Sequence, residues 1–122
     1  MKKLFLVMII ISNLTLFSGM IKPIDGSSLN YTHVLFEWDQ VADAVEYQIQ
    51  ISTSSSFSSI LSSGSTSSLI YIESEGIDWS DSYYWRIRPV YNDGSFGEWL
   101  DTFSFSTINS ITSADITVYD SD

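Results

Sequence analysis

Apolar and polar residues alternate along several short segments of this chain, as they do in β-strands that bury one face. Two such segments, residues 32–38 and 45–52, lie close together in the first half of the chain. Their apolar positions are Val34, Phe36, Trp38, Val45, Tyr47, Ile49 and Ile51. Because only a short polar break separates the two segments, the sequence predicts that they pair as a β-hairpin.

The clearest alternation occurs in residues 83–90, where Tyr83, Trp85 and Ile87 face one way and Tyr84, Arg86 and Arg88 face the other. Shorter apolar runs at 69–72 and 99–107 predict two further strands. The serine-rich residues 52–68 predict a connection with at most a short strand at its centre. With about seven short strands and no helical periodicity after residue 20, the pattern indicates an antiparallel β-sandwich and excludes an α/β arrangement.

The first 20 residues have the pattern of a signal peptide. Met1-Lys2-Lys3 is positively charged, and residues 4–11 form an unbroken apolar run. The run is too short for a membrane-spanning helix, which needs about 20 apolar residues. We therefore expect a signal peptide at 1–20, a folded domain at 21–107, and a linker or the start of a further domain at 108–122. We expect no stable membrane span after cleavage, and an extracellular location, secreted or at the cell surface.

The charge and composition of the chain argue against some classes of binding partner. The chain has 15 Asp and Glu against 5 Lys and Arg, a net charge of -10, and no cysteine. This balance argues against nucleic acids and anionic membranes as partners, because both need basic surfaces. Without disulfides, a folded exported domain depends on packing, and an aromatic content of 15% supplies the side chains for a core.

Five groups of residues follow one another in an order that resembles a fibronectin type III domain of the kind found in exported bacterial proteins. They are Phe36-x-Trp38-Asp39, Ala44-x-x-Tyr47-x-Ile49-x-Ile51-Ser52, Tyr83-Tyr84-Trp85-Arg86-Ile87-Arg88, Gly97-x-Trp99 and Phe103-x-Phe105-x-Thr107. The resemblance implies an all-β, immunoglobulin-like antiparallel sandwich of about seven strands over residues 21–107. It also implies that Trp38 is a core residue and that the Tyr83 hydroxyl bonds back to the preceding corner. The Arg-Gly-Asp loop of some animal members is missing, so integrin-type adhesion is not expected.

The pattern divides the aromatic residues and their neighbours in the strands into a predicted core and a candidate interaction surface. The predicted core comprises Phe36, Trp38, Tyr47, Ile49, Tyr83, Trp85, Ile87, Trp99, Phe103 and Phe105. The candidate interaction surface comprises Trp79, Tyr84, Arg86, Arg88 and Tyr91. Exposed aromatic rings bind sugars or anchor protein partners, and arginines beside them can form cation–π contacts. The alternative for this surface is a pair of solvated arginines beside an aromatic ring, with no ligand.

Residues with catalytic or metal-binding chemistry are scarce. The lone histidine, His33, falls out of phase with the apolar face of its strand, so we expect it at the surface. One histidine without cysteine is too little for a zinc site or a Ser-His-Asp triad. Glu73 and Glu75 share a strand face but have no recognisable cleft, and the acids at 78–81 and 120–122 form no calcium-loop motif. We therefore predict no catalytic residue, cofactor or metal ligand, and no enzymatic activity.

These observations predict a non-catalytic spacer or interaction module of an exported bacterial protein. Its partner would be a protein or a polysaccharide at the cell surface, and other domains of a longer chain are expected beside it. One alternative is the N-terminal fragment of a larger exported enzyme whose catalytic domain lies beyond residue 122. Another is a weak carbohydrate-binding module that uses Trp79, Tyr84 or Tyr91.

Overall fold

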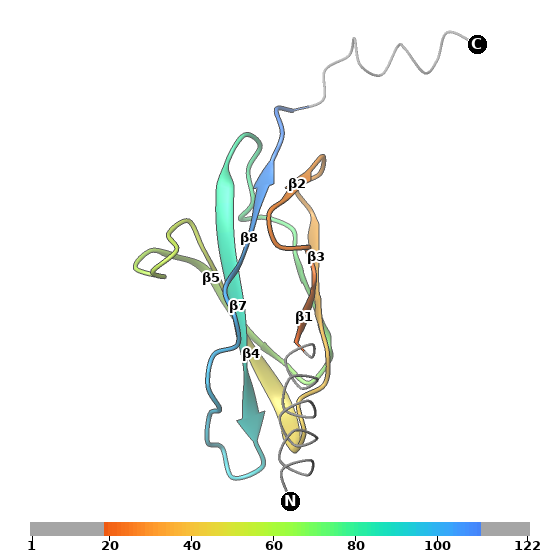
Figure 1. Ribbon diagram of the computed structural model, residues 1–122, viewed down its shortest axis with the longest axis vertical. Coiled ribbons are helices and arrows are strands. Elements are labelled where there is room, and N and C mark those ends of the chain that lie inside the picture. Colours follow the sequence, from red (N-terminus) through yellow and green to blue (C-terminus); the bar gives the residue numbers. More distant parts are fainter. Residues whose placement is uncertain (1–18, 111–122) are drawn as a thin grey trace, which may run out of the picture.

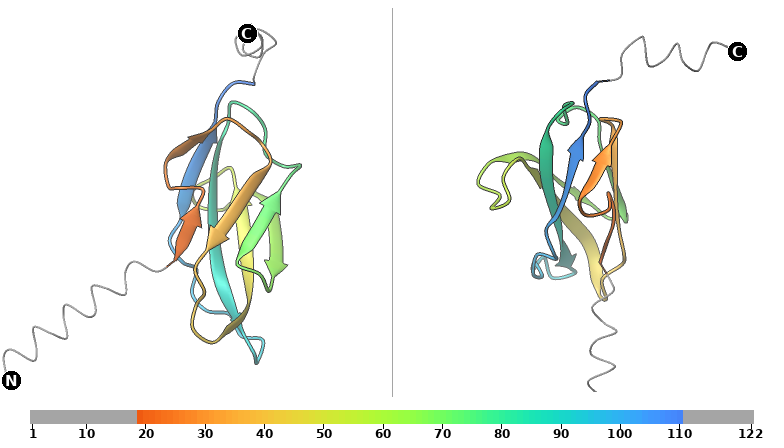
Figure 2. Two further views of the ribbon diagram at one scale, coloured as in Figure 1. Left: turned by 90° about the vertical axis from the view of Figure 1, so that its right-hand side faces the viewer. Right: turned by 45° about the horizontal axis from the view of Figure 1, so that its top comes forward.

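The structure, a computed structural model, describes residues 19–110 and is a sandwich of two β-sheets (Figures 1 and 2). In this range the chain forms eight strands: β1 (Met20–Lys22), β2 (Ser27–Leu29), β3 (Val34–Trp38), β4 (Ala44–Ser52), β5 (Ile60–Thr66), β6 (Ile70–Glu73), β7 (Ser82–Tyr91) and β8 (Phe103–Thr107). One sheet has the order β1-β3-β6 and the other the order β2-β8-β7-β4-β5. Neighbouring strands are antiparallel except β2 and β8. The predicted all-β sandwich is confirmed. Residues 1–18 of the predicted signal peptide and residues 111–122 lie outside the described residues, whereas Met20, the last residue of that prediction, begins β1.

Strands β3 and β4 do not form the predicted hairpin. Strand β3 pairs with β1 and β6 in one sheet, whereas β4 pairs with β5 and β7 in the other. Both strands carry large apolar side chains on one face, and those faces bury each other when the strands oppose one another across the interior. The rings of Trp38 and Tyr47, for example, meet at 5.6 Å between centroids. The short break at 39–43 therefore crosses between the sheets.

The serine-rich segment contains a longer strand than the sequence predicted. Strand β5 has seven residues and pairs with β4 from Tyr47 opposite Thr66 to Ser52 opposite Ile60. It is an edge strand, so backbone hydrogen bonds hold it without a buried apolar face of its own. The connection between β4 and β5 projects away from the sandwich (Figure 1).

A pairing irregularity explains the one apolar position of β4 that points outward. The register with β7 shifts between Ala44 and Glu46, which is a β-bulge. Val45 lies at this shift and is 51% exposed, although the alternation placed it with Tyr47 on the apolar face. The extra residue breaks the two-residue period, so the prediction for Val45 was wrong.

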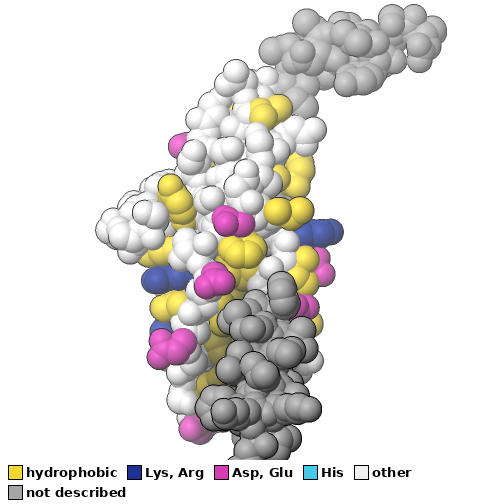
Figure 3. Space-filling model, in the orientation of Figure 1, with side chains coloured by type: hydrophobic (Ala, Val, Ile, Leu, Met, Phe, Trp, Pro, Cys, Tyr) yellow, Lys and Arg dark blue, Asp and Glu magenta, His cyan; other side chains and the backbone are white. Residues whose placement is uncertain are grey.

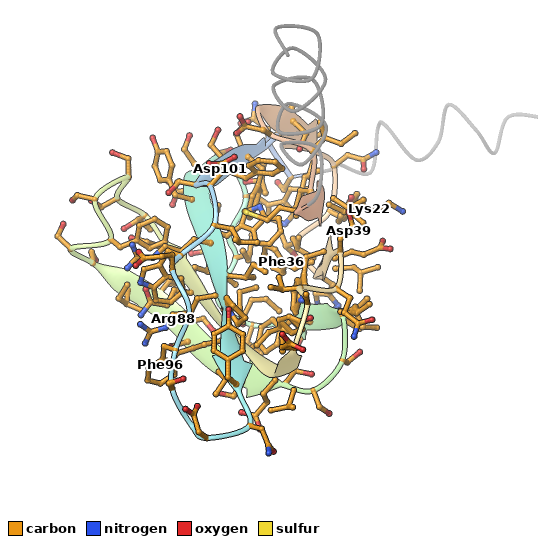
Figure 4. The ribbon with its side chains drawn as sticks, turned by 60° about the horizontal axis from the view of Figure 1, so that its bottom comes forward. Lys22, Phe36, Asp39, Arg88, Phe96 and Asp101 are labelled. Atoms are coloured by element: carbon orange, nitrogen blue, oxygen red, sulfur yellow. The ribbon has the colours of Figure 1, made fainter. Side chains whose placement is uncertain are left out.

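The core lies between the two sheets and is largely aromatic. Phe36, at its centre in Figure 4, contacts Trp85 and Phe105 at 5.0 and 5.8 Å between ring centroids. Each such pair contributes about 0.5–1.5 kcal/mol beyond the burial of its area. Of the predicted core residues, these are buried: Phe36, Trp38, Tyr47, Ile49, Tyr83, Trp85, Ile87 and Phe105. Phe103 packs against the cluster half-buried.

Trp99 is not a core residue, which corrects the sequence prediction. Its position was in phase with Phe103 and Phe105, but β8 begins only at Phe103. Residues 92–102 connect β7 to β8, and strand alternation does not hold there. The Trp99 ring is half-buried and lies against arginine side chains of β7.

The corner between β6 and β7 is closed by side-chain hydrogen bonds. The backbone N–H of Asp78 donates to the Tyr83 hydroxyl at 2.7 Å, as the resemblance implied. The Thr107 hydroxyl donates to the carbonyl of Asp78 at 2.6 Å and accepts from the N–H of Asp81 at 3.1 Å. These bonds join the corner to both β7 and β8, which fixes the end of the sandwich where β8 ends.

Candidate functional site

The outer face of the five-stranded sheet carries a stack of alternating aromatic rings and guanidinium groups. The Cζ atom of Arg86 lies 4.0 Å from the ring centre of Phe57 and 4.1 Å from that of Trp99. The Cζ atom of Arg88 lies 4.4 Å from Trp99 and 3.8 Å from Phe96. Figure 4 shows Arg88 and Phe96 side by side on the outside of the sandwich. We call this stack the arginine ladder; its members, in spatial order, are Phe57, Arg86, Trp99, Arg88 and Phe96.

Strand geometry explains why the two arginines project together. Arg86 and Arg88 are alternate residues of β7, and the neighbours that point inward, Trp85 and Ile87, are fully buried. On β4, Gln50 lies opposite Arg86 and Gln48 lies opposite Arg88.

The two glutamines orient the guanidinium groups. The Gln50 Oε1 atom accepts from Nε and Nη2 of Arg86 at 3.1 and 2.8 Å. The Gln48 Oε1 atom accepts from Nε of Arg88 at 2.7 Å. An amide oxygen satisfies these donors without neutralising the charge.

The aromatic members of the ladder come from two connections. Phe57 belongs to the β4–β5 connection and has a positive φ of 58°. Phe96 and Trp99 belong to the β7–β8 connection, which hydrogen bonds hold along β7: Gly97 N–H to the Pro89 carbonyl at 2.9 Å and Leu100 N–H to the Ile87 carbonyl at 2.8 Å. The ladder therefore fastens both connections to the sheet.

The ladder concentrates positive charge on an acidic molecule. Burial lowers the pKa of Arg86, and the neighbouring charge of Arg88 lowers it further, yet an arginine stays protonated at neutral pH. The basic residues in 19–110 are Lys22, Arg86 and Arg88, so two of the three lie in the ladder. Within that range the only ion pair joins Lys22 and Glu37, at 4.0 Å on the other sheet. Figure 3 shows the basic side chains on two sides of the molecule, separated by acidic and apolar ones.

The predicted interaction surface is divided by the structure. Tyr84, Arg86 and Arg88 share the outer face of β7, and all three are half-buried. Trp79 lies in the β6–β7 connection, before β7 begins. Tyr91 is the last residue of β7 and is in phase with the inward-facing Tyr83, Trp85 and Ile87. The five residues therefore do not form one patch. Sequence reasoning missed the ladder members Phe57, Phe96 and Trp99 and the two glutamines, because their positions depend on loop paths and strand register.

The acidic and histidine side chains form no comparable cluster. His33 is exposed and lines a hollow of about 420 Å³ beside β1, β2 and β3, together with Lys22 and Tyr31. Oε2 of Glu73 accepts from the backbone N–H of Glu75 and Gly76, so it orders a turn. In the part of the chain that the structure describes, no three His, Asp or Glu side chains are grouped to hold a metal ion. Nor does this part contain a helix long and apolar enough to cross a membrane.

Comparison with known proteins identifies the fold. No family model and no curated protein matches the chain. One solved structure that superposes on this chain is the sixth fibronectin type III domain from human fibronectin type III domain containing protein 3. The TM-score is 0.55 at 16% sequence identity, and the match covers 76% of this chain and 82% of that one. The chain has a fibronectin type III-like fold. The predicted immunoglobulin-like sandwich is thereby confirmed.

Two other solved structures superpose on this chain. An α-L-rhamnosidase from Dictyoglumus thermophilum matches with a TM-score of 0.59 and 14% identity, over 77% of this chain but only 13% of that one. CopC from Methylosinus trichosporium OB3b matches with a TM-score of 0.53 and 14% identity, over 78% of this chain and 97% of that one. At these identities the likeness is one of fold, which occurs here both as most of a chain and as a small part of a large enzyme.

Proposed function

We propose that the chain is a non-catalytic spacer and interaction module of an exported protein. The observation that carries this proposal is the position of the ends of the described chain. Gly19 accepts a hydrogen bond from the N–H of Asp39, where β3 has ended, whereas Ile108 accepts one from Ser80 at the β6–β7 corner. These points lie at opposite ends of the sandwich (Figure 1). A ten-residue strand such as β7 spans about 33 Å, so the fold holds whatever follows Ile108 at the far end of the sandwich from Asp39.

The chemistry of the side chains in residues 19–110 also fits a spacer. The hollow beside His33 has no carboxylate in its lining. At the β6–β7 corner, the Asp81 carboxylate accepts a hydrogen bond from the backbone N–H of Ser82. The arginine ladder has charge but no nucleophile or general base among its members. Its chemistry is suited to binding and to holding loops in place.

A rigid spacer predicts a fixed distance between its two ends. Because the chain has no cysteine, spin labels can be attached selectively at Gln40→Cys and Ile108→Cys, both exposed positions at opposite ends. Pulsed dipolar spectroscopy is expected to give one narrow, long distance. A control pair at Gln40→Cys and Asn92→Cys, at the same end, is expected to give a short one. A broad distribution for the first pair would contradict the proposal.

Export is supported by the sequence pattern of residues 1–20. When these residues are fused to an alkaline phosphatase that lacks its own leader, we expect activity outside the cytoplasm, where its disulfides form. Replacing Leu6 and Ile9 with arginine interrupts the apolar run and should abolish that activity. Activity that is absent in the unmodified fusion, or unchanged by the two arginines, argues against export.

A second candidate function is an accessory domain of a larger exported enzyme. The rhamnosidase favours it, because a domain of this fold occupies 13% of that chain. Reading the coding sequence beyond Asp122 separates the two candidates. A catalytic domain in the same frame supports the accessory role, whereas further sandwich domains or a surface anchor support the spacer.

A further inference from the structure

The arginine ladder carries charge that the domain itself leaves uncompensated. Glu46 lies two residues from Gln48 on β4, and Glu98 is next to Trp99, yet neither pairs with a guanidinium group in the described structure. The positions opposite the arginines hold glutamines, which satisfy Nε but leave the charge in place. A sheet that only needed to hold these side chains would gain more from glutamate there, because cross-strand pairs of opposite charge are stabilising.

The guanidinium groups also keep free donors. An arginine has five N–H groups, and hydrogen bonds within the domain occupy Nε and Nη2 of Arg86 but only Nε of Arg88. The buried side-chain nitrogens without a partner in residues 19–110 belong to Trp38 and Trp85. The remaining Nη atoms of the two arginines therefore reach solvent.

The spacing of the free donors matches a polypeptide in extended conformation. Arg86 and Arg88 are alternate residues of a strand, so they are about 7 Å apart along it. Side chains at alternate positions of an extended peptide have the same repeat. Two carboxylates of such a peptide can each approach one guanidinium at its edge, where paired hydrogen bonds to carboxylate form.

The aromatic rings prepare the arginines for such a ligand. The Cζ atom of each guanidinium lies within 4.4 Å of two ring centroids, so the aromatic contacts restrain both arginine side chains. Side chains already ordered lose little entropy on binding. Phe96, at one end of the ladder, is 53% exposed and offers an apolar contact to the next residue of a bound peptide.

We propose that the arginine ladder binds an extended acidic peptide segment of a partner protein, with carboxylates at alternate positions. This names the partner of the interaction module and rests on that part of the proposed function, but not on the spacer role. Charge complementarity selects an acidic ligand, and the strand-like repeat selects a polypeptide. A polysaccharide of uronic acids has its carboxylates on rigid rings with a different repeat and serves as the competing probe.

The test uses the full chain and a capped eight-residue peptide of alternating threonine and glutamate. The readout is the NMR signal of each arginine Nε–H during titration. Both arginine signals are expected to shift in a saturable manner, and a peptide of the same composition with its four glutamates adjacent should bind several-fold more weakly. Equal binding of the two peptides, no shift, or tighter binding of polygalacturonate would overturn the proposal.

Three variants locate the site. Arg88→Gln removes one charge-assisted pair and should weaken binding about tenfold. Gln48→Glu with Gln50→Glu should weaken it by a similar factor while the aromatic stack and the thermal stability are retained, because the new carboxylates neutralise the arginines. Lys22→Gln removes the same charge from the other sheet and should change affinity less than about twofold. Unchanged binding in the double glutamate variant, or an equal loss in Lys22→Gln, refutes the assignment.

Discussion

At the scale of single residues, Tyr83 shows how one side chain serves both the core and the backbone. Its ring is buried against Phe105, with 5.4 Å between the ring centroids, while its hydroxyl accepts from the Asp78 N–H. Residues 77–81 form no strand, so no neighbouring strand supplies a carbonyl acceptor for this N–H. The hydroxyl therefore replaces a partner that a sheet neighbour would supply elsewhere.

Removing this hydroxyl should destabilise the domain. In Tyr83→Phe the ring remains but the Asp78 N–H loses its partner, which we expect to lower the free energy of unfolding by about 1–2 kcal/mol. Urea denaturation followed by tryptophan fluorescence measures the change. Tyr84→Phe, one residue along on the outer face, is the matched control and should cost less than about 0.5 kcal/mol. Equal effects of the two substitutions would contradict the role of the corner bond.

The same hydroxyl gives the domain an alkaline limit. Burial raises the pKa of Tyr83 above its ordinary value of about 10. The stability linked to the protonated hydroxyl is therefore complete below the unfolded pKa and declines as the pH rises through the folded one. Urea midpoints measured between pH 8 and 11 should fall less steeply at the alkaline end in Tyr83→Phe than in the unmodified chain.

At the scale of elements, the sequence predicted which segments are strands better than which strands pair. Alternation located β3, β4 and β7 because each buries one face, but it is equally compatible with strands side by side and strands facing across a core. It underestimated β5, whose seven residues are held by backbone bonds rather than by apolar side chains. The alternation of apolar and polar residues shows which face of a strand is buried. Which strands pair depends on contacts between distant parts of the chain, and these leave no local pattern in the sequence.

The arginine ladder illustrates the same limit at the candidate site. The alternation of 83–90 placed Tyr84, Arg86 and Arg88 on one face, as the structure does. Their aromatic partners lie on the β4–β5 and β7–β8 connections. Neither the alternation of apolar residues nor the turn-forming residues predicts the path of the backbone there. Trp99 was assigned to the core by extending the phase of β8 backwards into residues that are not strand.

The path of the β7–β8 connection depends on a glycine, which gives a prediction at this scale. A Cβ atom at Gly97 would lie 2.6 Å from Cγ of Pro89, a buried and rigid ring. Gly97→Ala should therefore cost about 1–3 kcal/mol of stability and loosen Trp99 from the arginines. Denaturation and the Nε–H signals of the arginines measure the two effects.

Gly64 provides the comparison for this prediction. A Cβ atom there would lie 2.7 Å from Cε1 of Tyr71, the outer part of a half-buried side chain that can move aside. Gly64→Ala should cost less than Gly97→Ala and leave the arginine signals unchanged. A larger loss of stability at position 64 would show that the β7–β8 connection adapts more easily than the close contact with Pro89 implies.

At the scale of the whole molecule, packing of the aromatic core stabilises the fold, and repulsion between acidic side chains destabilises it. The chain has a net charge of -10 and no disulfide, and residues 19–110 contain the single ion pair of Lys22 with Glu37. Acidic side chains therefore repel one another over the surface without local compensation. Such repulsion is greater in the compact state than in the unfolded chain, and salt screens it.

The melting temperature should accordingly rise when sodium chloride is increased from 10 to 300 mM, because the Debye length falls from about 30 Å to less than 8 Å. A variant with Asp43→Asn, Glu46→Gln and Asp101→Asn, all at exposed positions, should melt higher than the unmodified chain at low salt and respond less to added salt. Asparagine tolerates the positive φ of 67° at position 43, so that substitution adds no backbone strain. Differential scanning calorimetry provides the comparison. If both proteins gain equally from salt, the effect is not screening of these charges, and the acidic surface does not limit the stability of the fold.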